Sequence, residues 1–276
     1  KEEMEELIEN AKSPLTPEGG IVDRLLAPSQ PPRGEEIFSQ SDKPCKLHRE
    51  KSVTSFSSPR GGREGVVEAP VRISIARDSA FNFTYRANID SLREVGEVKF
   101  FSPLEDEKMP ECDLLYLPGG YPELFASELA DNASMRESIK AFAENGGKIF
   151  AECGGFMYLC NDIDGIPMCA VFPFSATMMD AKLHLGYREL TNLNSSLCTL
   201  HSSLLRGHEF HYSSVVEPDT LPEGIKKEQC QLSAKGKTVD TALYHYKNVI
   251  AGYTHWYWAE KGFEEFIKEL ECNFIL

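Results

Sequence analysis

The stretch KIFAECGGFMYL, at residues 148–159, combines a short apolar strand, a turn of small residues and an apolar helix. The turn is Glu152-Cys153-Gly154-Gly155, and its two glycines let the backbone bend sharply without a Cβ clash. Hydrolases hold a nucleophile in such an elbow between strand and helix. We therefore predict that Cys153 is a nucleophile, the alternative being a buried structural cysteine.

A thiolate that attacks a carbonyl needs an activating environment and donors for the oxyanion. Cys153 would begin the helix that follows it, where the dipole is expected to lower the pKa of the thiol. We predict oxyanion donors among the backbone N–H groups of Gly119, Gly120 and Gly154, because no side chain blocks the approach there.

The composition excludes several classes of partner. The 276 residues carry a formal charge of −14, from 29 basic and 43 acidic side chains, which argues against nucleic acid or an anionic membrane. No run of 18 apolar residues predicts a transmembrane helix. The eight cysteines are dispersed, without a CxxC pair, so we expect a reducing, cytoplasmic compartment.

Two regions differ in character along the chain. Residues 1–69 begin with a helical pattern and continue into a stretch rich in Pro, Ser and Gly, which we interpret as the remnant of an upstream domain plus a largely irregular linker. Residues 70–276 are expected to form the compact domain. The chain does not begin with Met, so we expect a piece of a longer protein and leave organelle targeting open.

The first half of the compact domain alternates strands with helices. We expect strands at 71–76, 98–101, 114–120 and 148–151, and helices at 88–95, 124–130, 135–145 and after Cys153. This alternation predicts an α/β fold with a mostly parallel sheet and helices on both faces. Ligand sites of such sheets lie at the carboxyl ends of strands, so Gly119-Gly120 and Cys153 should face one crevice.

The second half is expected to add antiparallel β structure. Candidate strands are residues 168–174, 185–191, 209–216, 241–246 and 249–253, with a closing helix at 264–270.

Three histidines are candidates for a base. His255 follows a strand of buried character, whereas His208 and His211 alternate with other residues near a strand start. A single histidine among aromatic residues is more often a packed core residue, so the sequence favours His255 only slightly. His208 and His211 have no third ligand nearby, so we predict no metal site. The sequence also contains no GxxxxGK[ST] phosphate loop, and we expect no ATP site in this chain.

Taken together, these motifs resemble one family. The domain resembles the class I glutamine amidotransferase half of the cobyrinic acid a,c-diamide synthases, a flavodoxin-like fold, over roughly residues 71–258. The matching stretches are VRISIARDSAFNFTY, FFSPLEDEKMPECDLLYLPGGYPELFASELADN, KIFAECGGFMYL, HLGYREL, RGHEFHYS and GYTHWYW. Their combination is specific, although no single stretch is.

The resemblance implies that Cys153 attacks the side-chain amide of glutamine and releases ammonia, with His255 raising its nucleophilicity. The oxyanion hole would be formed near Gly119–Gly120 and at Gly154. Most class I glutaminases carry an acid two residues after the His, where this sequence has Tyr257, so a Cys–His dyad is expected. Two further motif residues are expected to orient substrate or hold an interface, Arg188 and Glu209.

The resemblance also implies partners. Ammonia would pass to an ATP-binding synthetase domain or subunit, where ATP and Mg²⁺ activate the a and c carboxylates of a corrin precursor, cobyrinate or hydrogenobyrinate, in cobalamin biosynthesis. No cofactor is expected in this chain itself. Three alternatives stay open: the related nickel-sirohydrochlorin a,c-diamide synthase, a non-catalytic binding or regulatory module, and a cysteine hydrolase.

Overall fold

The computed structural model describes residues 70–179, 181–190, 205–229 and 231–259. The helix expected within 1–12, the linker and the closing helix at 264–270 lie outside these ranges. The domain boundary near residue 70 stays a prediction.

Five parallel strands form the centre of the domain. They are β1 (Val71–Ala76), β2 (Gly96–Phe101), β3 (Leu114–Leu117), β4 (Lys148–Glu152) and β14 (Val249–Gly252). Their order in the sheet is β2-β1-β3-β4-β14, and each neighbouring pair runs parallel. This is the 2-1-3-4-5 order of flavodoxin-like folds, which confirms the predicted fold class.

We expected the strand at 249–253, observed as β14, to belong to the antiparallel part of the domain. This prediction is wrong for one of its two edges. β14 pairs parallel with β4 and antiparallel with β13 (Leu243–Tyr246), which in turn pairs with β11 (Ile225–Glu228). All four residues of β14 are buried. A short run that is apolar throughout suits the interior of a parallel sheet, where both faces are covered.

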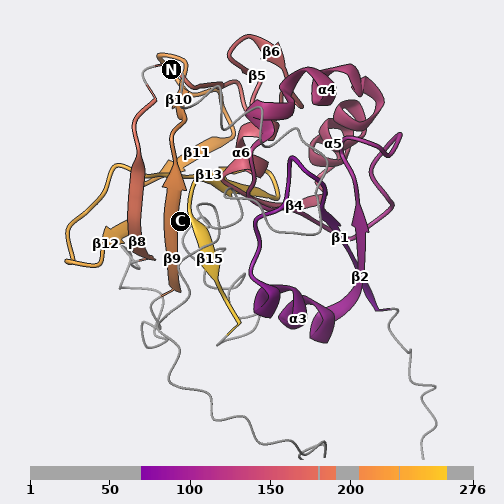
Figure 1. The fold of residues 1–276 in the computed structure, drawn as a ribbon, viewed down its shortest axis with the longest axis horizontal. Coiled ribbons are helices and arrows are strands. Elements are labelled where there is room, and N and C mark those ends of the chain that lie inside the picture. Colours follow the sequence, from indigo (N-terminus) through magenta and orange to yellow (C-terminus); the bar gives the residue numbers. More distant parts are fainter. Residues whose placement is uncertain (1–69, 180, 191–204, 230, 260–276) are drawn as a thin grey trace, which may run out of the picture. The chain divides into compact units, whose positions relative to one another are not determined.

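The two faces of the sheet are covered differently. One face packs against η1 (Pro122–Phe125), α4 (Ala126–Asp131), α5 (Ala133–Glu144) and α6 (Gly154–Leu159). The other face packs against α3 (Arg86–Val95) and two buried tryptophans, Trp256 and Trp258. Figure 1 shows α3 on the opposite side of the sheet from α4 and α5. Successive apolar residues of β3, β4 and β14 alternate between the two cores, so both faces of these inner strands are apolar.

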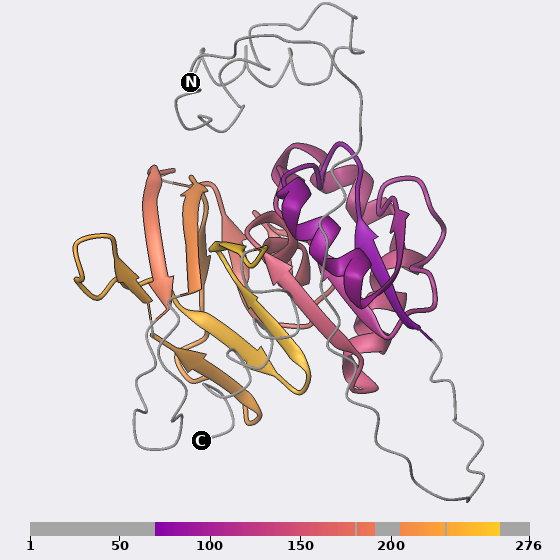
Figure 2. The ribbon, with the colours of Figure 1, turned by 90° about the horizontal axis from the view of Figure 1, so that it is seen from below.

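Two further sheets complete the described residues. One has the order β12-β8-β9-β15 and is antiparallel, with β12 (Gln231–Ser233), β8 (His184–Leu190), β9 (Leu205–His211) and β15 (His255–Tyr257). The other has the order β10-β7-β5-β6, with β5 (Asp162–Ile163), β6 (Ile166–Pro167), β7 (Ser175–Thr177) and β10 (Ser214–Val216). Figures 1 and 2 both place β8 and β9 beside the parallel sheet.

The expected strand at 168–174 is absent, and this prediction is wrong. Its amides bind the carbonyls at the end of α6: Cys169 donates to Tyr158 and Phe172 donates to Leu159, each at 2.9 Å. Ala170 has a φ of 52°, which a strand does not allow. The apolar run therefore covers a helix end instead of joining a ladder.

The expected strand at 209–216 divides into two. β9 ends at His211 and pairs with β8 and β15, whereas β10 begins at Ser214 and pairs with β7. The sequence of residues 209–216 has a continuous β pattern, which gives no indication that the chain passes from one sheet to another. The segment between the two strands, Tyr212 and Ser213, reaches the edge of the site described below.

We predict that Phe150→Ala lowers the free energy of unfolding by about 3–5 kcal/mol. Phe150 is buried in the centre of β4, stacks on Tyr116 at a centroid distance of 5.9 Å and meets Trp258 edge-on at 5.8 Å. Urea unfolding measures the change. The control Leu185→Ala removes a side chain that is 63% exposed, and should shift stability by less than about 0.5 kcal/mol. Equal losses in both variants would contradict this packing.

Candidate active site

Cys153 occupies the predicted elbow between β4 and α6. Its φ of 47° and ψ of −106° lie outside the regions that L-residues favour, so the surrounding structure holds this conformation. The Cys153 amide donates to the Gly252 carbonyl at 2.8 Å, which ties the elbow to β14. At Gly155 a Cβ would overlap the Leu117 carbonyl, so only glycine allows α6 to pack this closely against β3.

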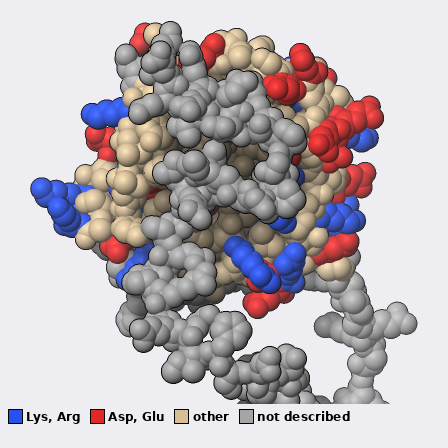
Figure 3. Space-filling view, in the orientation of Figure 1, with Lys and Arg blue, Asp and Glu red and all other residues tan. Residues whose placement is uncertain are grey.

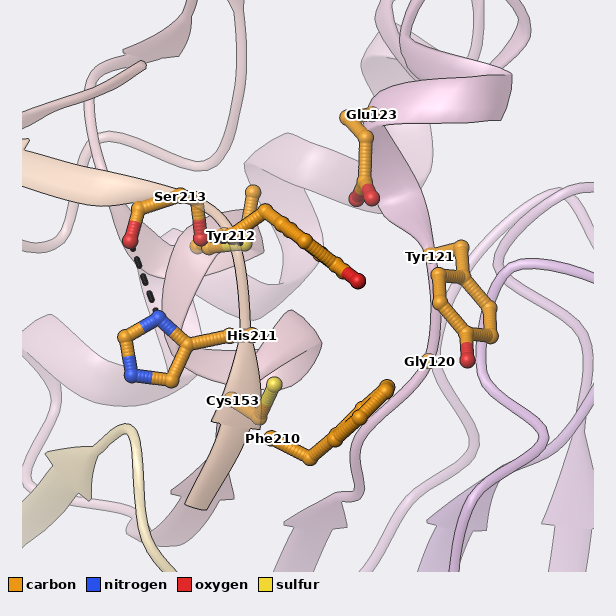
Figure 4. Close-up of a pocket in the computed structure, with 9 residues that line it drawn as sticks. Gly120, Tyr121, Glu123, Cys153, Phe210, His211, Tyr212 and Ser213 are labelled. Carbon is orange, nitrogen blue, oxygen red and sulfur yellow. Dashed lines mark hydrogen bonds between the residues drawn. The ribbon is translucent and has the colours of Figure 1, made fainter. Parts of the chain in front are cut away.

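The Cys153 sulfur faces a small pocket. The pocket is lined by Gly120, Tyr121, Glu123, Cys153, Met157, Phe210, His211, Tyr212 and Ser213. Figure 4 shows the sulfur of Cys153 and the carboxylate of Glu123 directed into the same space, with the hydroxyl end of Tyr212 between them. One wall therefore comes from the loop after β3 and the other from the end of β9.

The expected lowering of the thiol pKa is wrong for this structure. Cys153 is only 5% exposed, and burial, followed by the negative charge of Glu123, raises the pKa of its thiol. The amide of Gly154 acts in the opposite direction but is outweighed. α6 has six residues, and a dipole that short cannot compensate for loss of water.

The structure brings the predicted oxyanion glycines together. A Cβ at Gly154 would lie 2.9 Å from the Gly120 amide nitrogen, so the two loops are in direct contact. The next amide in each loop already makes a hydrogen bond to the backbone. The Gly155 amide donates to the Pro118 carbonyl at 3.0 Å, and the Tyr121 amide donates to the Ala80 carbonyl at 2.9 Å. Gly120 and Gly154 are therefore the better candidate donors beside the sulfur.

His255 lies against the same loop. A Cβ at Gly119 would overlap the His255 ring, so the missing side chain of Gly119 makes room for the imidazole. The ring also packs edge-on against Phe83, with centroids 4.5 Å apart, and stacks on His208 at 5.0 Å. Because Gly119 adjoins Gly120, which touches Gly154, the loop connects the imidazole with the elbow.

The His255 imidazole is buried and neutral. Burial, followed by the neighbouring His208 and His211, lowers its pKa well below the ordinary value. Its Nδ1 is buried and has no hydrogen-bond partner among the described residues. Tyr257 follows two residues later in β15 and is 37% exposed. No carboxylate therefore stands at the position two residues after the histidine.

The other two histidines are held by neighbours. His208 shares a 2.7 Å hydrogen bond between its Nδ1 and the Tyr85 hydroxyl. His211 Nδ1 donates to the Ser213 carbonyl at 2.9 Å, its ring stacks on Tyr253 at 3.8 Å, and burial lowers its pKa to about 4. Although His211 lines the pocket, Figure 4 shows its ring directed away from Cys153. Within the described ranges no group of three or more candidate ligands is arranged to hold a metal ion.

Arg188 and Glu209 are bound to each other. Arg188 Nη2 donates to Glu209 Oε2 at 2.6 Å across β8 and β9, and Glu209 is fully buried. The Thr254 hydroxyl donates to Gln231 Oε1 at 2.7 Å and lies 3.3 Å from the other Glu209 oxygen. Thr254 directly precedes His255, so this network supports the start of β15. A direct role for Arg188 or Glu209 toward substrate stays a prediction.

A second buried carboxyl joins the two halves of the site. Glu152, 2% exposed and immediately before Cys153, accepts the Trp256 amide at 2.8 Å and the Tyr116 hydroxyl at 2.7 Å. Trp256 immediately follows His255. Burial raises the pKa of Glu152 to about 8, although both hydrogen bonds favour the ionised form. Glu152 therefore fixes the strand that carries the imidazole to the strand that carries the thiol.

Comparison with known proteins identifies the domain. Residues 72–263 match the model of the CobB/CobQ-like glutamine amidotransferase domain. The chain belongs to this family. A solved glutamine amidotransferase also aligns with 74% of this chain and 99% of its own, at 17% identity and a TM-score of 0.46, but so distant a likeness adds nothing to the assignment.

Curated relatives of this amidotransferase domain carry the name cobyrinate a,c-diamide synthase. The protein of Fusobacterium nucleatum is 41% identical over 209 residues, which are 72% of this chain and 44% of the relative. The protein of Methanothermobacter thermautotrophicus is 48% identical over 147 residues, 53% and 33% respectively. For Picrophilus torridus the identity is 36% over 224 residues, 77% and 46%. This chain thus spans less than half the length of each.

Glu123 and Glu152 were given no role in the sequence analysis, although both lie within the motifs quoted there. In each case the local sequence indicates a residue with a special environment. Glu152 is an acid at the end of an otherwise apolar strand, and Glu123 is the acid of PGGYPE. Their neighbours, Trp256 and Tyr212, are about 90 or more residues away in sequence, so only the fold shows what each carboxyl faces.

The surface of the amidotransferase domain mixes both signs of charge. On the face shown in Figure 3, acidic side chains are numerous along the right-hand edge, and Lys and Arg lie among them. Of the helices that the structure describes, none is long and apolar enough to cross a membrane.

We predict that Glu152→Gln flattens the dependence of stability on pH. The folded pKa of about 8 exceeds the ordinary 4.5, so the folded protein holds one more proton than the unfolded chain between these values. Stability therefore falls as the pH rises from about 4.5 through 8. Gln imitates the protonated acid, since its carbonyl accepts from Trp256 and its amide donates to Tyr116.

Urea unfolding at pH 5, 6, 7 and 8 tests this prediction. The free energy of unfolding of Glu152→Gln, minus that of the wild type, should become more favourable to the variant as the pH rises. Other titrating groups cancel in this difference. Parallel curves would contradict a buried, proton-binding Glu152.

Proposed function

We propose that this chain is the glutaminase part of an ATP-dependent, glutamine-hydrolysing tetrapyrrole a,c-diamide synthase. The observation that carries the proposal is the strained Cys153 elbow, which opens onto a pocket beside a glycine loop that packs against His255. The names of the relatives and the family of the domain support glutamine as the amido donor.

The proposed reaction forms and breaks one thioester. Cys153 Sγ bonds to the side-chain amide carbon of glutamine, and the oxygen accepts hydrogen bonds from the amides of Gly120 and Gly154. The carbon–nitrogen bond then breaks, and the thiol proton leaves with the nitrogen as ammonia after transfer through His255. Water hydrolyses the thioester to glutamate and restores the thiol.

The electrostatics favour a neutral thiol and a neutral imidazole before substrate binds. Burial raises the pKa of Cys153 and lowers that of His255, so an ion pair is disfavoured in the closed pocket. A neutral imidazole can accept the thiol proton as the sulfur attacks. We propose His255 as this base, because His208 and His211 are engaged with Tyr85 and Ser213.

We assign the synthetase chemistry to a partner that is either an upstream domain or a separate subunit. The relatives are more than twice as long as the part that matches, and no GxxxxGK[ST] loop occurs in this sequence. We propose that ATP and Mg²⁺ act on that partner, where they would activate carboxylates of cobyrinate, hydrogenobyrinate or nickel-sirohydrochlorin for attack by ammonia. A cytoplasmic, reducing location is supported by the four cysteines in the described ranges, which are all free and buried: Cys112, Cys153, Cys160 and Cys169.

We predict that 6-diazo-5-oxo-L-norleucine forms a single adduct with the chain, at Cys153. The adduct should be absent in Cys153→Ser and at least tenfold slower in His255→Ala, because the buried thiol needs a base. Intact-mass spectrometry against time measures both effects.

Cys160→Ser is the matched control. Cys160 is also a free, fully buried thiol of this segment, but it does not line the pocket. Its replacement should leave the rate of adduct formation unchanged. An unmodified wild type, with or without a cognate ATP-binding partner, would favour the non-catalytic binding module instead.

We predict that Cys153→Ala abolishes amidation with glutamine as the nitrogen source but not amidation with ammonium. With the ATP-binding partner present, amidation from glutamine should fall at least a hundredfold, whereas amidation from added ammonium should persist, because Cys153 only supplies ammonia. Counting amidated tetrapyrrole by mass spectrometry gives both rates. Retention of glutamine-dependent amidation would refute the proposed role of Cys153.

A further inference from the structure

The acidic side chain in the Cys153 pocket has no role in the reaction above. Glu123 is the second residue of the short helix η1 after the glycine loop, and its carboxylate enters the pocket from the side opposite the end of β9. It shares this space with the sulfur of Cys153 and the rings of Tyr121, Phe210 and Tyr212. A molecule that reaches the thiol must therefore pass close to a carboxylate.

The residues that line the pocket include no Lys and no Arg to pair with Glu123. In Figure 4, the labelled side chains that lie beside the carboxylate are those of Tyr121 and Tyr212, and burial raises the pKa of Glu123 to about 7. A partly buried carboxylate without a cation in the lining of its pocket gains most from a charged donor, because a charge-assisted hydrogen bond is stronger than a neutral one. The pocket is therefore complementary to a ligand that brings a cation.

We propose that Glu123 binds the α-ammonium group of glutamine while the side-chain amide lies at Cys153. This inference rests on the proposed function. Glutamine carries one cation, one anion and one neutral amide; the amide must meet the sulfur, and Glu123 repels the α-carboxylate. The ammonium is the group that fits the remaining polar end of the pocket. Glu123 thereby selects amino-acid amides over amides without an amine.

Two electrophiles that differ only in the amine test the assignment. One is 6-diazo-5-oxo-L-norleucine and the other is 6-diazo-5-oxohexanoate, which has the same reactive end and the same carboxylate but no amine. In both, the sulfur bonds to the terminal carbon, dinitrogen leaves, and the thiol proton remains on that carbon. The ratio of the two labelling rates at Cys153 cancels any change in the reactivity of the thiol.

The wild-type chain should react ten- to a hundredfold faster with the amine-bearing probe. Glu123→Gln should reduce this preference to less than threefold, and Glu123→Asp, which keeps the charge, should retain part of it. Glu128→Gln is the matched control, since Glu128 is an exposed acid in the next helix, and it should keep the wild-type ratio.

A wild-type preference that survives in Glu123→Gln overturns the assignment, as does a wild type without any preference. Neither result contradicts the proposed glutaminase function, because labelling of Cys153 would still occur. Failure of both probes to label Cys153 in the wild type would refute the proposed function, and the assignment with it. Circular dichroism of each variant shows whether a changed ratio comes from a folded protein.

Discussion

The site depends on one buried interaction, the acceptance of the Trp256 amide by the Glu152 carboxyl at 2.8 Å. Glu152 ends the central strand and precedes Cys153, while Trp256 follows His255. A single carboxyl thus ties the strand that ends before the thiol to the strand that begins with the imidazole, and the Tyr116 hydroxyl binds its second oxygen. Since Glu152 is excluded from water, losing either partner would leave a buried polar group unpaired, which is costly.

The antiparallel sheet gives the parallel sheet a second wall. A flavodoxin-like sheet supplies the elbow and the glycine loop at the carboxyl ends of its strands, but these alone form an open edge. The end of β9 closes that edge with Phe210 and Tyr212, and β15 places His255 against Gly119 of the glycine loop. Closure removes water, and this has a double effect: it raises the pKa of the Cys153 thiol and strengthens every interaction with a charged ligand.

Two carboxylates of the domain behave differently because only one of them is paired with a cation. Glu209 is fully buried but already bound to Arg188, and the Thr254 hydroxyl lies 3.3 Å from its other oxygen, so Glu209 supports the start of β15. Glu123 has no cation among the residues that line its pocket, and its carboxylate faces the thiol. The first carboxylate stabilises the scaffold, and the second is available to a ligand.

The sequence alone determined what depends on neighbours along the chain. The strand–turn–helix around Cys153, the glycine loop and the alternating elements follow from local periodicity and from glycines at tight turns, and the structure agrees. The tertiary structure decided what depends on distant partners. The division of residues 209–216 between two sheets, the raised pKa of the thiol, and the partners of Glu152 all arise from contacts between remote segments. Burial and pairing are properties of the packed chain, so no local pattern could show them.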